Sequence, residues 1–337
     1  MSDVTLKPAK KPDSKALREF ISKNAIYLVL VGLFIGIGLL DKNFFSVNNL
    51  RNVLIIASVR VIIALGVGGT LITRGTDLSS GRVVGLTACI AASLLQRPDY
   101  AYKMFKDLPY LPVIVPILLV ILVGLMIGVL NGLVIAYLKV PPFIATLGMM
   151  VIVYGAACIY TNAQPIGGLR DDFTGIASGS LFSIPNLILI ASGVALFMWF
   201  ILNKTRFGKY IYAIGGNPSA AEVSGVNVER TLIKVYALAG ALYGLAGALL
   251  AARTGGATNN YGLMYELDAI AAATIGGVST SGGIGTVSGI ITGVMIFEVL
   301  NNGLVILGVS AYWQQVIKGL IIVGAVAFDI RKYLAKK

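Results

Sequence analysis

The chain has 337 residues, of which 57% are hydrophobic and 12% are charged, and its formal net charge is +12. Soluble globular domains are roughly 45–50% apolar, so this composition argues against a soluble enzyme and indicates a membrane protein. A charge of +12 could suggest nucleic acid as a partner, but the basic residues lie mostly at the ends of apolar segments. Membrane topology accounts for that placement, and no nucleic-acid partner is expected.

Apolar segments predict about ten membrane-spanning helices, because a bilayer core needs about 20 apolar residues per helix. In chain order they cover residues 25–41, 51–73, 79–96, 111–138, 141–161, 183–203, 231–252, 266–282, 285–306 and 313–330. The prediction is an all-α polytopic fold with three parts. These are an N-terminal tail at 1–24, a transmembrane domain at 25–330 and a basic tail at 331–337.

Charge sets the orientation of these spans. With a cytoplasmic N-terminus, most of the 27 lysines and arginines fall on the cytoplasmic side. An even number of spans then places both termini in the cytoplasm. Glycines four residues apart, at 128/132, 240/244, 285/289 and 289/293, predict helices that pack closely.

The sequence lacks residues that hydrolytic enzymes commonly use. The chain has no histidine and no phosphate-binding loop of the form G-x-x-x-x-G-K-[ST], so hydrolysis by this chain is not expected. Cys89 and Cys158 lie in apolar segments and are expected to be inert. Glu298 lies inside an apolar run, which keeps a proton-coupled carrier open as an alternative, beside a passive channel or scaffold. Arg60 and Lys318 also lie within spans and are expected to reach an interface or pair with a carboxylate.

The polar segment 203–231 is the longest predicted cytoplasmic loop between spans. Asn217-Pro218 predicts the start of a short helix and Gly225 predicts its end. A helix of two turns is not stable alone in water, so it must pack against something. Two interpretations stay open, a docking surface for a cytoplasmic partner and an ordinary structured loop.

Motifs along the chain resemble a known family. The residues that carry the resemblance are Thr205-Arg206-Phe207-Gly208, Gly215-Gly216-Asn217-Pro218, Ser224-Gly225-Val226-Asn227, Gly75-Thr76-Asp77-Leu78-Ser79, Asn131-Gly132, the segments 142–148 and 265–271, and Tyr312-Trp313-Gln314. Together they resemble the permease family of ribose, galactose and xylose ABC importers, over essentially the whole chain after residue 25. Segments 73–79, 203–209 and 257–260 are most similar to the members that carry methyl galactosides, whereas 162–182 matches poorly.

The resemblance implies a permease subunit of an ATP-driven monosaccharide importer in the bacterial inner membrane. Galactose, glucose or methyl galactoside is the favoured substrate, with ribose or xylose as the alternative. The implied partners are a second copy of the chain, a cytoplasmic ATPase that binds ATP and Mg, and an extracytoplasmic sugar-binding protein. The implied ATPase-coupling loop contains Gly216, Asn217, Pro218, Ala220, Ala221, Glu222, Ser224, Gly225 and Val226.

Candidates for the translocation pathway are polar residues inside or beside apolar spans. They are Asn131, Thr146, Asn301 and Asn302. A transport site must release what it binds, so weak amide and hydroxyl partners suit it. Hydrogen bonding between helices is the alternative explanation for each of the four.

Overall fold

The computed structural model describes the backbone of residues 14–334 and the side chains of residues 24–327. The helices are α1 (Ser14–Leu40), η1 (Lys42–Phe45), α2 (Val47–Ile72), α3 (Ser80–Leu94), α4 (Ile114–Ala136), α5 (Pro142–Thr161), α6 (Asp171–Ser178), α7 (Asn186–Lys204), α8 (Arg206–Gly216), α9 (Pro218–Val223), α10 (Val228–Thr254), α11 (Tyr265–Ile275), α12 (Val287–Ile306) and α13 (Ala311–Leu334). A hairpin of two short strands, β1 (Ser180–Leu181) and β2 (Ile184–Pro185), lies between α6 and α7.

The predicted all-α membrane architecture is confirmed. Each of the ten predicted spans coincides with a helix, although their lengths differ. Within the described residues, α2, α4, α5, α7, α10 and α12 are long and apolar enough to cross a membrane. Where side chains are described, α1, α3 and α13 contribute shorter apolar stretches at 24–40, 80–94 and 311–327, and α11 has only 11 residues.

Two predicted boundaries differ from the structure by more than the others do. The span predicted at 266–282 ends at Ile275, because Gly277 has a φ of +87° that a right-handed helix does not allow. Residues 276–286 instead form a loop. At the other end of the chain, α1 begins at Ser14 and so extends into the predicted tail 1–24. Residues 1–13 and 335–337 of the predicted tails lie outside the described residues.

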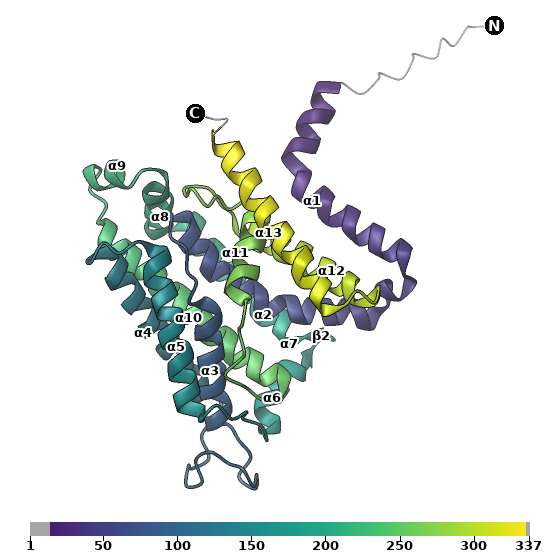
Figure 1. Cartoon of the computed structure of the whole chain (residues 1–337), viewed down its shortest axis with the longest axis vertical. Helices are drawn as coiled ribbons and strands as arrows, with labels where there is room; N and C mark the ends of the chain where they lie inside the picture. The colour runs from purple at the N-terminus through teal and green to yellow at the C-terminus, as the bar shows by residue number, and fades with distance from the viewer. Residues whose placement is uncertain (1–13, 335–337) are drawn as a thin grey trace, which may run out of the picture.

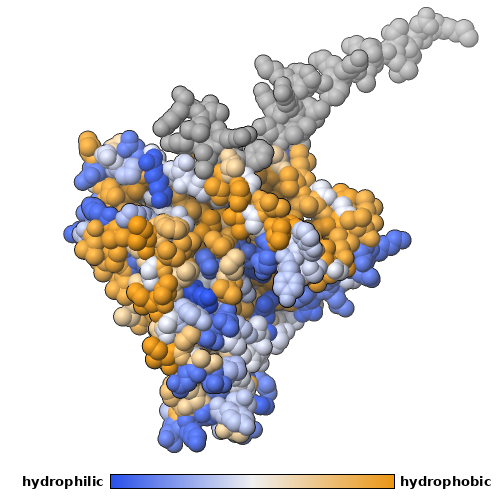
Figure 2. Space-filling view, viewed as in Figure 1, coloured by the Kyte–Doolittle hydropathy of each residue, from blue (hydrophilic) through white to orange (hydrophobic). Residues whose placement is uncertain are grey.

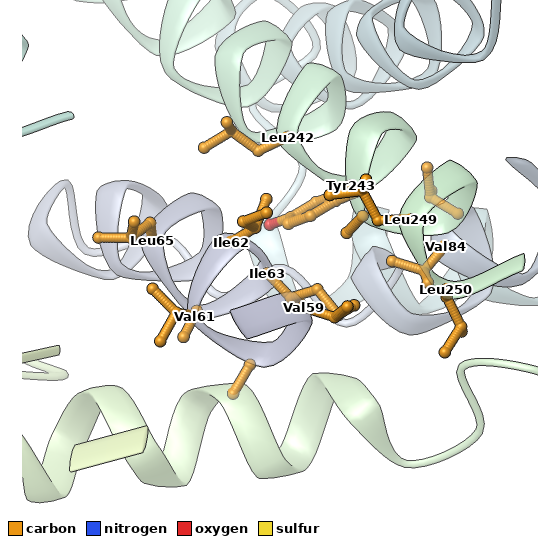
Figure 3. Close-up of a cluster of buried hydrophobic side chains, with 14 of the residues drawn as sticks. Val59, Val61, Ile62, Ile63, Leu65, Val84, Leu242, Tyr243, Leu249 and Leu250 are labelled. Carbon is orange, nitrogen blue, oxygen red and sulfur yellow. The ribbon is translucent and has the colours of Figure 1, made fainter. Parts of the chain in front are cut away.

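The core forms around α2 and α10. The burial of an apolar 18-residue stretch differs from helix to helix. The buried share is 83% in α2 and 78% in α10, against 28% in α4 and α7 and 17% in α5. Figure 3 shows where α2, α3 and α10 meet, with Tyr243 of α10 reaching across to Ile62 and Ile63 of α2. In a bilayer, a helix with little burial inside its own chain exposes its apolar surface to lipid or to another protein.

Close helix packing occurs at the predicted small residues. A Cβ on Gly128 of α4 would stand 2.1 Å from the carbonyl oxygen of Tyr236 in α10. A Cβ on Gly240 of α10 would likewise stand 2.1 Å from the carbonyl oxygen of Gly124. Such distances leave no room for any side chain, so glycine is required for α4 to lie this close to α10.

The elements outside the spans gather at two opposite ends of the molecule (Figure 1). The helices α8 and α9 lie at the same end as the last turns of α13 and the first turns of α1. The helix α6 and the connection from α3 to α4 lie at the other end. Figure 2 shows a broad orange surface between these ends, as expected for residues that contact lipid.

Candidate functional site

Two consecutive helices, α8 and α9, build the surface of the predicted coupling loop. The hydroxyl of Thr205 accepts a hydrogen bond from Gly208 N at 3.1 Å and caps α8. The side chain of Asn217 accepts one from Ala220 N at 3.1 Å and caps α9. After α9, Gly225 adopts a φ of +85°. The predicted start and end of the short helix are therefore confirmed, whereas α8 was not predicted from the sequence.

The residues of the predicted coupling loop divide into an inner and an outer set. Ala221 and Val226 are buried and pack with Ile214 of α8. The outer set is exposed and consists of Gly216, Asn217, Ala220, Glu222, Ser224 and Gly225, while Pro218 is half-buried. Val223, which is 91% exposed, was not among the residues predicted from the sequence. It lies on the exposed side of α9 together with the outer set.

The end of α8 is held against two loops of the membrane domain. Arg74 donates from Nε to the carbonyl oxygen of Gly215 at 2.7 Å, and from Nη2 to that of Gly216. The hydroxyl of Tyr212 donates to the carbonyl oxygen of Gly285 at 2.8 Å. Because Gly283 N also donates to the carbonyl oxygen of Ile72 at 2.8 Å, these contacts join α8, the α2–α3 loop and loop 276–286. We call them the Arg74 clamp.

Asn131 and Thr146 both bind the α2–α3 loop. Asn131 Nδ2 donates to Ser79 Oγ at 3.0 Å, and Ser79 Oγ donates to Asp77 Oδ1 at 2.6 Å. Thr146 Oγ1 donates to the carbonyl oxygen of Thr76 and accepts from Leu78 N at 3.1 Å. Asn131 is 1% exposed and Thr146 is fully buried. Both tie a helix to the loop, so a sugar could reach them only after the helices separate.

The other two pathway candidates lie on α12, away from this loop. Asn302 exchanges two hydrogen bonds of 2.9 Å with the side chain of Asn49 at the start of α2. The side-chain amide atoms of Asn301 are buried without a hydrogen-bond partner among the described residues. The four candidates therefore do not form one surface, and their role in a pathway stays a prediction.

Four charged residues meet within the membrane domain. Arg60 Nη1 pairs with Glu298 Oε1 and lies 3.5 Å from Asp268 Oδ2, which is 3.4 Å from Lys318 Nζ. The expected pairing of Arg60 and Lys318 with carboxylates is confirmed. Two cations and two anions balance, which is how charged groups persist away from water. Glu298 has this structural explanation, so the carrier alternative loses the observation that supported it.

A smaller cluster forms at the opposite end from α9. The guanidinium of Arg170 lies 3.6 Å from the ring centroid of Tyr110, donates from Nε to Asp172 Oδ1 at 3.0 Å and donates to the carbonyl oxygen of Leu111 at 2.8 Å. Hydrogen bonds from Arg170 hold the pKa of the Asp172 carboxyl below its ordinary value. Arg170 thus fastens α6 to the α3–α4 connection, within the segment whose family resemblance is poor.

Known proteins resemble the chain along most of its length. The galactose/methyl galactoside import permease protein MglC of Escherichia coli is 51% identical over 96% of this chain and 99% of its own. The protein of the same name from Haemophilus influenzae is 51% identical over 95% of this chain and 97% of its own. The ribose import permease protein RbsC of Bacillus subtilis is 40% identical over 91% of this chain and 92% of its own. No solved structure matches the chain.

The family match covers the membrane domain just described. The family described as "Branched-chain amino acid transport system / permease component" matches residues 49–326, from the start of α2 into α13. Because that match spans most of the chain and the relatives extend over nearly all of it, the chain is a multi-pass membrane protein that belongs to this family of transport-system permeases.

Proposed function

We propose that the chain is the permease subunit of an ATP-driven importer of galactose, glucose and methyl galactosides in the bacterial inner membrane. One observation carries the choice of sugar. Relatives named for galactose and methyl galactoside are 50–51% identical over 95–96% of the chain, whereas those named for ribose are 38–40% identical. Ribose is therefore the second candidate substrate and the natural control.

ATP hydrolysis in this proposal belongs to a separate subunit. The sequence of this chain has no G-x-x-x-x-G-K-[ST] loop, so ATP and Mg bind to a cytoplasmic ATPase. The exposed residues of α9 and the following turn, Ala220, Glu222, Val223 and Ser224, dock onto that ATPase. Movement of α9 reaches the membrane domain through the Arg74 clamp, because Arg74 holds the end of α8 directly.

The remaining partners are a second copy of the chain and an extracytoplasmic sugar-binding protein. We place the second copy against α5, since only 17% of the apolar stretch of this helix is buried within its own chain. The binding protein would meet the end that carries α6 and the Arg170 cluster, opposite to α9 (Figure 1).

Reconstitution tests the whole assignment. We would place the chain with its ATPase in proteoliposomes, add the binding protein, and follow labelled galactose and ribose with and without ATP. We expect uptake of galactose that needs both ATP and the binding protein, with ribose far slower. Uptake driven by a proton gradient alone would overturn the proposal in favour of a carrier, and faster ribose uptake would overturn the choice of sugar.

A further inference from the structure

A patch of polar side chains lies on the surface between α5 and α11. The guanidinium carbon of Arg82 on α3 stands 4.3 Å from the ring centroid of Tyr154 on α5. Arg82 Nη1 donates to the carbonyl oxygen of Asn259 at 3.4 Å, and Asn259 Nδ2 contacts Cys158 Sγ at 3.2 Å. We call Arg82, Tyr154, Asn259 and the exposed Asn260 the Arg82 patch.

The patch lies well inside the membrane. Tyr154 belongs to the 20-residue apolar helix α5, seven residues before its end at Thr161. At 1.5 Å per residue, this places the Tyr154 backbone about 10 Å from that end of the helix and about 18 Å from the other. The guanidinium of Arg82 stacks on that ring, so it too lies at membrane depth.

Non-helical backbone accompanies the patch at this depth. Residues 255–264 run from the end of α10 alongside α3 to the start of α11 (Figure 1). A Cβ on Gly85 would stand 2.3 Å from the carbonyl oxygen of Tyr261, and one on Gly81 would stand 2.2 Å from that of Gly262. Irregular backbone is tolerated at membrane depth only where protein buries it or where it lines a water-filled cavity.

Protein does not bury this side of the segment in the single chain. Asn260 is exposed, Leu263 is 53% exposed and Met264 is 41% exposed. Figure 2 shows pale and blue residues interrupting the orange surface in the middle of this face. Leu263 and Met264 tolerate lipid, but exposure to lipid would be costly for Asn260 and for unpaired backbone groups of the segment, so this face meets water or a second copy of the chain.

Arg82 has hydrogen-bonding capacity to spare. A guanidinium offers several N–H donors in a planar fork. Among the described residues, only the carbonyl oxygen of Asn259 accepts a hydrogen bond from Arg82. Glu266 attracts Arg82 electrostatically, but no ion pair joins the two among the described residues. Unused donors at membrane depth need acceptors from outside the chain, and water and sugar hydroxyls can supply them.

We propose that the Arg82 patch lines the water-filled pathway and contacts the monosaccharide as it crosses. This inference rests on the proposed function and identifies the surface of this chain that contacts the transported sugar. The ring of Tyr154, which is 36% exposed, offers an apolar surface to the C–H face of a pyranose, while Arg82 and Asn260 offer donors to its hydroxyls. Each contact is weak alone, which suits a site that must release its ligand.

Thiol labelling tests water access without depending on transport. In a background of Cys89→Ala and Cys158→Ser, first shown to take up galactose, we would introduce Tyr154→Cys and, as control, Leu196→Cys on α7, where Leu196 is 66% exposed. A charged, membrane-impermeant thiol reagent should label position 154 at least about tenfold faster than position 196, because thiolates form and react in water. Saturating galactose with the binding protein should slow labelling at 154.

Transport tests the contact with sugar. Arg82→Gln should lower the maximal rate of galactose uptake about tenfold, the factor that one charged hydrogen bond represents. ATP hydrolysis stimulated by the loaded binding protein should stay within about twofold of wild type, since coupling through α9 is untouched. Arg82→Lys should recover part of the rate. Tyr160→Phe on the same helix, where Tyr160 bonds Ser93 instead, is the matched control and should transport normally.

The outcomes separate this inference from the proposed function. If wild-type proteoliposomes take up galactose with ATP, the proposed function stands whatever the variants do. Equal labelling at 154 and 196 would then overturn the pathway, and fast labelling with normal uptake by Arg82→Gln would overturn the sugar contact. Absence of ATP-driven uptake by the wild-type protein would instead overturn the proposed function itself.

Discussion

Glu298 illustrates how one residue decides between two mechanisms. It is 4% exposed and pairs with Arg60, which also lies 3.5 Å from Asp268. A proton-coupled carrier needs an acid that gains and loses a proton in each cycle, whereas a structural acid needs only its partner. The pairing favours the structural role.

Two substitutions distinguish these roles. Glu298→Gln keeps a hydrogen-bond acceptor for Arg60, with Asp268 still 3.5 Å from the guanidinium, and should preserve ATP-driven uptake within about threefold. Glu298→Leu removes the acceptor and should lower the free energy of unfolding by roughly 3 kcal/mol, the low end for a broken buried pair. Thermal unfolding in detergent and uptake in proteoliposomes measure the two effects. Loss of uptake by Glu298→Gln in a well-folded protein would revive the carrier.

Asp172 makes a prediction about pH. Hydrogen bonds from Arg170 lower its pKa in the folded protein, so the pair stabilises the protein above the ordinary carboxyl pKa of about 4. That contribution disappears as pH falls through the lowered folded-state pKa. Asp172→Asn should therefore unfold at a lower temperature than wild type at pH 7, and the difference should shrink towards pH 3. A difference that stays constant down to pH 3 would contradict the role given to this pair.

At the scale of the element, α9 carries the proposed coupling. Gly225 has a φ of +85° and its N–H donates to the carbonyl oxygen of Glu222 at 2.9 Å. Proline fixes φ near about −65° and has no N–H. Glu222→Arg with Gly225→Pro should therefore abolish uptake, with the rate falling at least about tenfold. The reason is that the double variant changes both the shape and the charge of the docking surface. The amount of protein in the membrane should not change.

Gly225→Asn is the matched control for this experiment. Asparagine tolerates a positive φ and keeps the N–H, so this variant should transport within about twofold of wild type. Normal uptake by the double variant would remove α9 from the coupling mechanism.

The elements also show what could be predicted from the sequence. Asn217-Pro218 and Gly225 predicted α9 because capping and positive φ are local properties. The helix α8 was missed, since its Arg206 and Lys209 suggested a polar loop and its buried Ile211 and Ile214 have partners elsewhere in the chain. The pairing of Arg60 with Glu298 spans 238 residues, and no local pattern indicates it. The Arg82 patch was missed for the same reason, because α3, α5 and segment 255–264 meet only in the folded chain.

At the scale of the whole molecule, the two ends of the bundle must face different compartments. The first turns of α1, the last turns of α13 and α9 lie at one end (Figure 1). The sequence predicted a cytoplasmic side for both termini from the distribution of lysine and arginine. Which side of the membrane this end faces stays a prediction.

Accessibility in intact cells tests that orientation. An impermeant reagent added outside should label a cysteine introduced at exposed Tyr102 in the α3–α4 connection, and should not label one at exposed Val223 in α9 until the cells are opened. The Cys89→Ala and Cys158→Ser background removes the native thiols. The reverse pattern would invert the topology and would place α9 out of reach of a cytoplasmic ATPase.

In the Arg74 clamp, the guanidinium of Arg74 donates hydrogen bonds to the main-chain oxygens of Gly215 and Gly216 and not to side chains. Any sequence that folds into the same pair of helices presents the same two acceptors. Under the proposed coupling, the clamp does not depend on the sequence of α9, and the choice of ATPase is separable from the transmission of movement to the membrane domain. Exchanging residues 217–224 between relatives should redirect a permease to another importer's ATPase while leaving its membrane domain and its sugar unchanged.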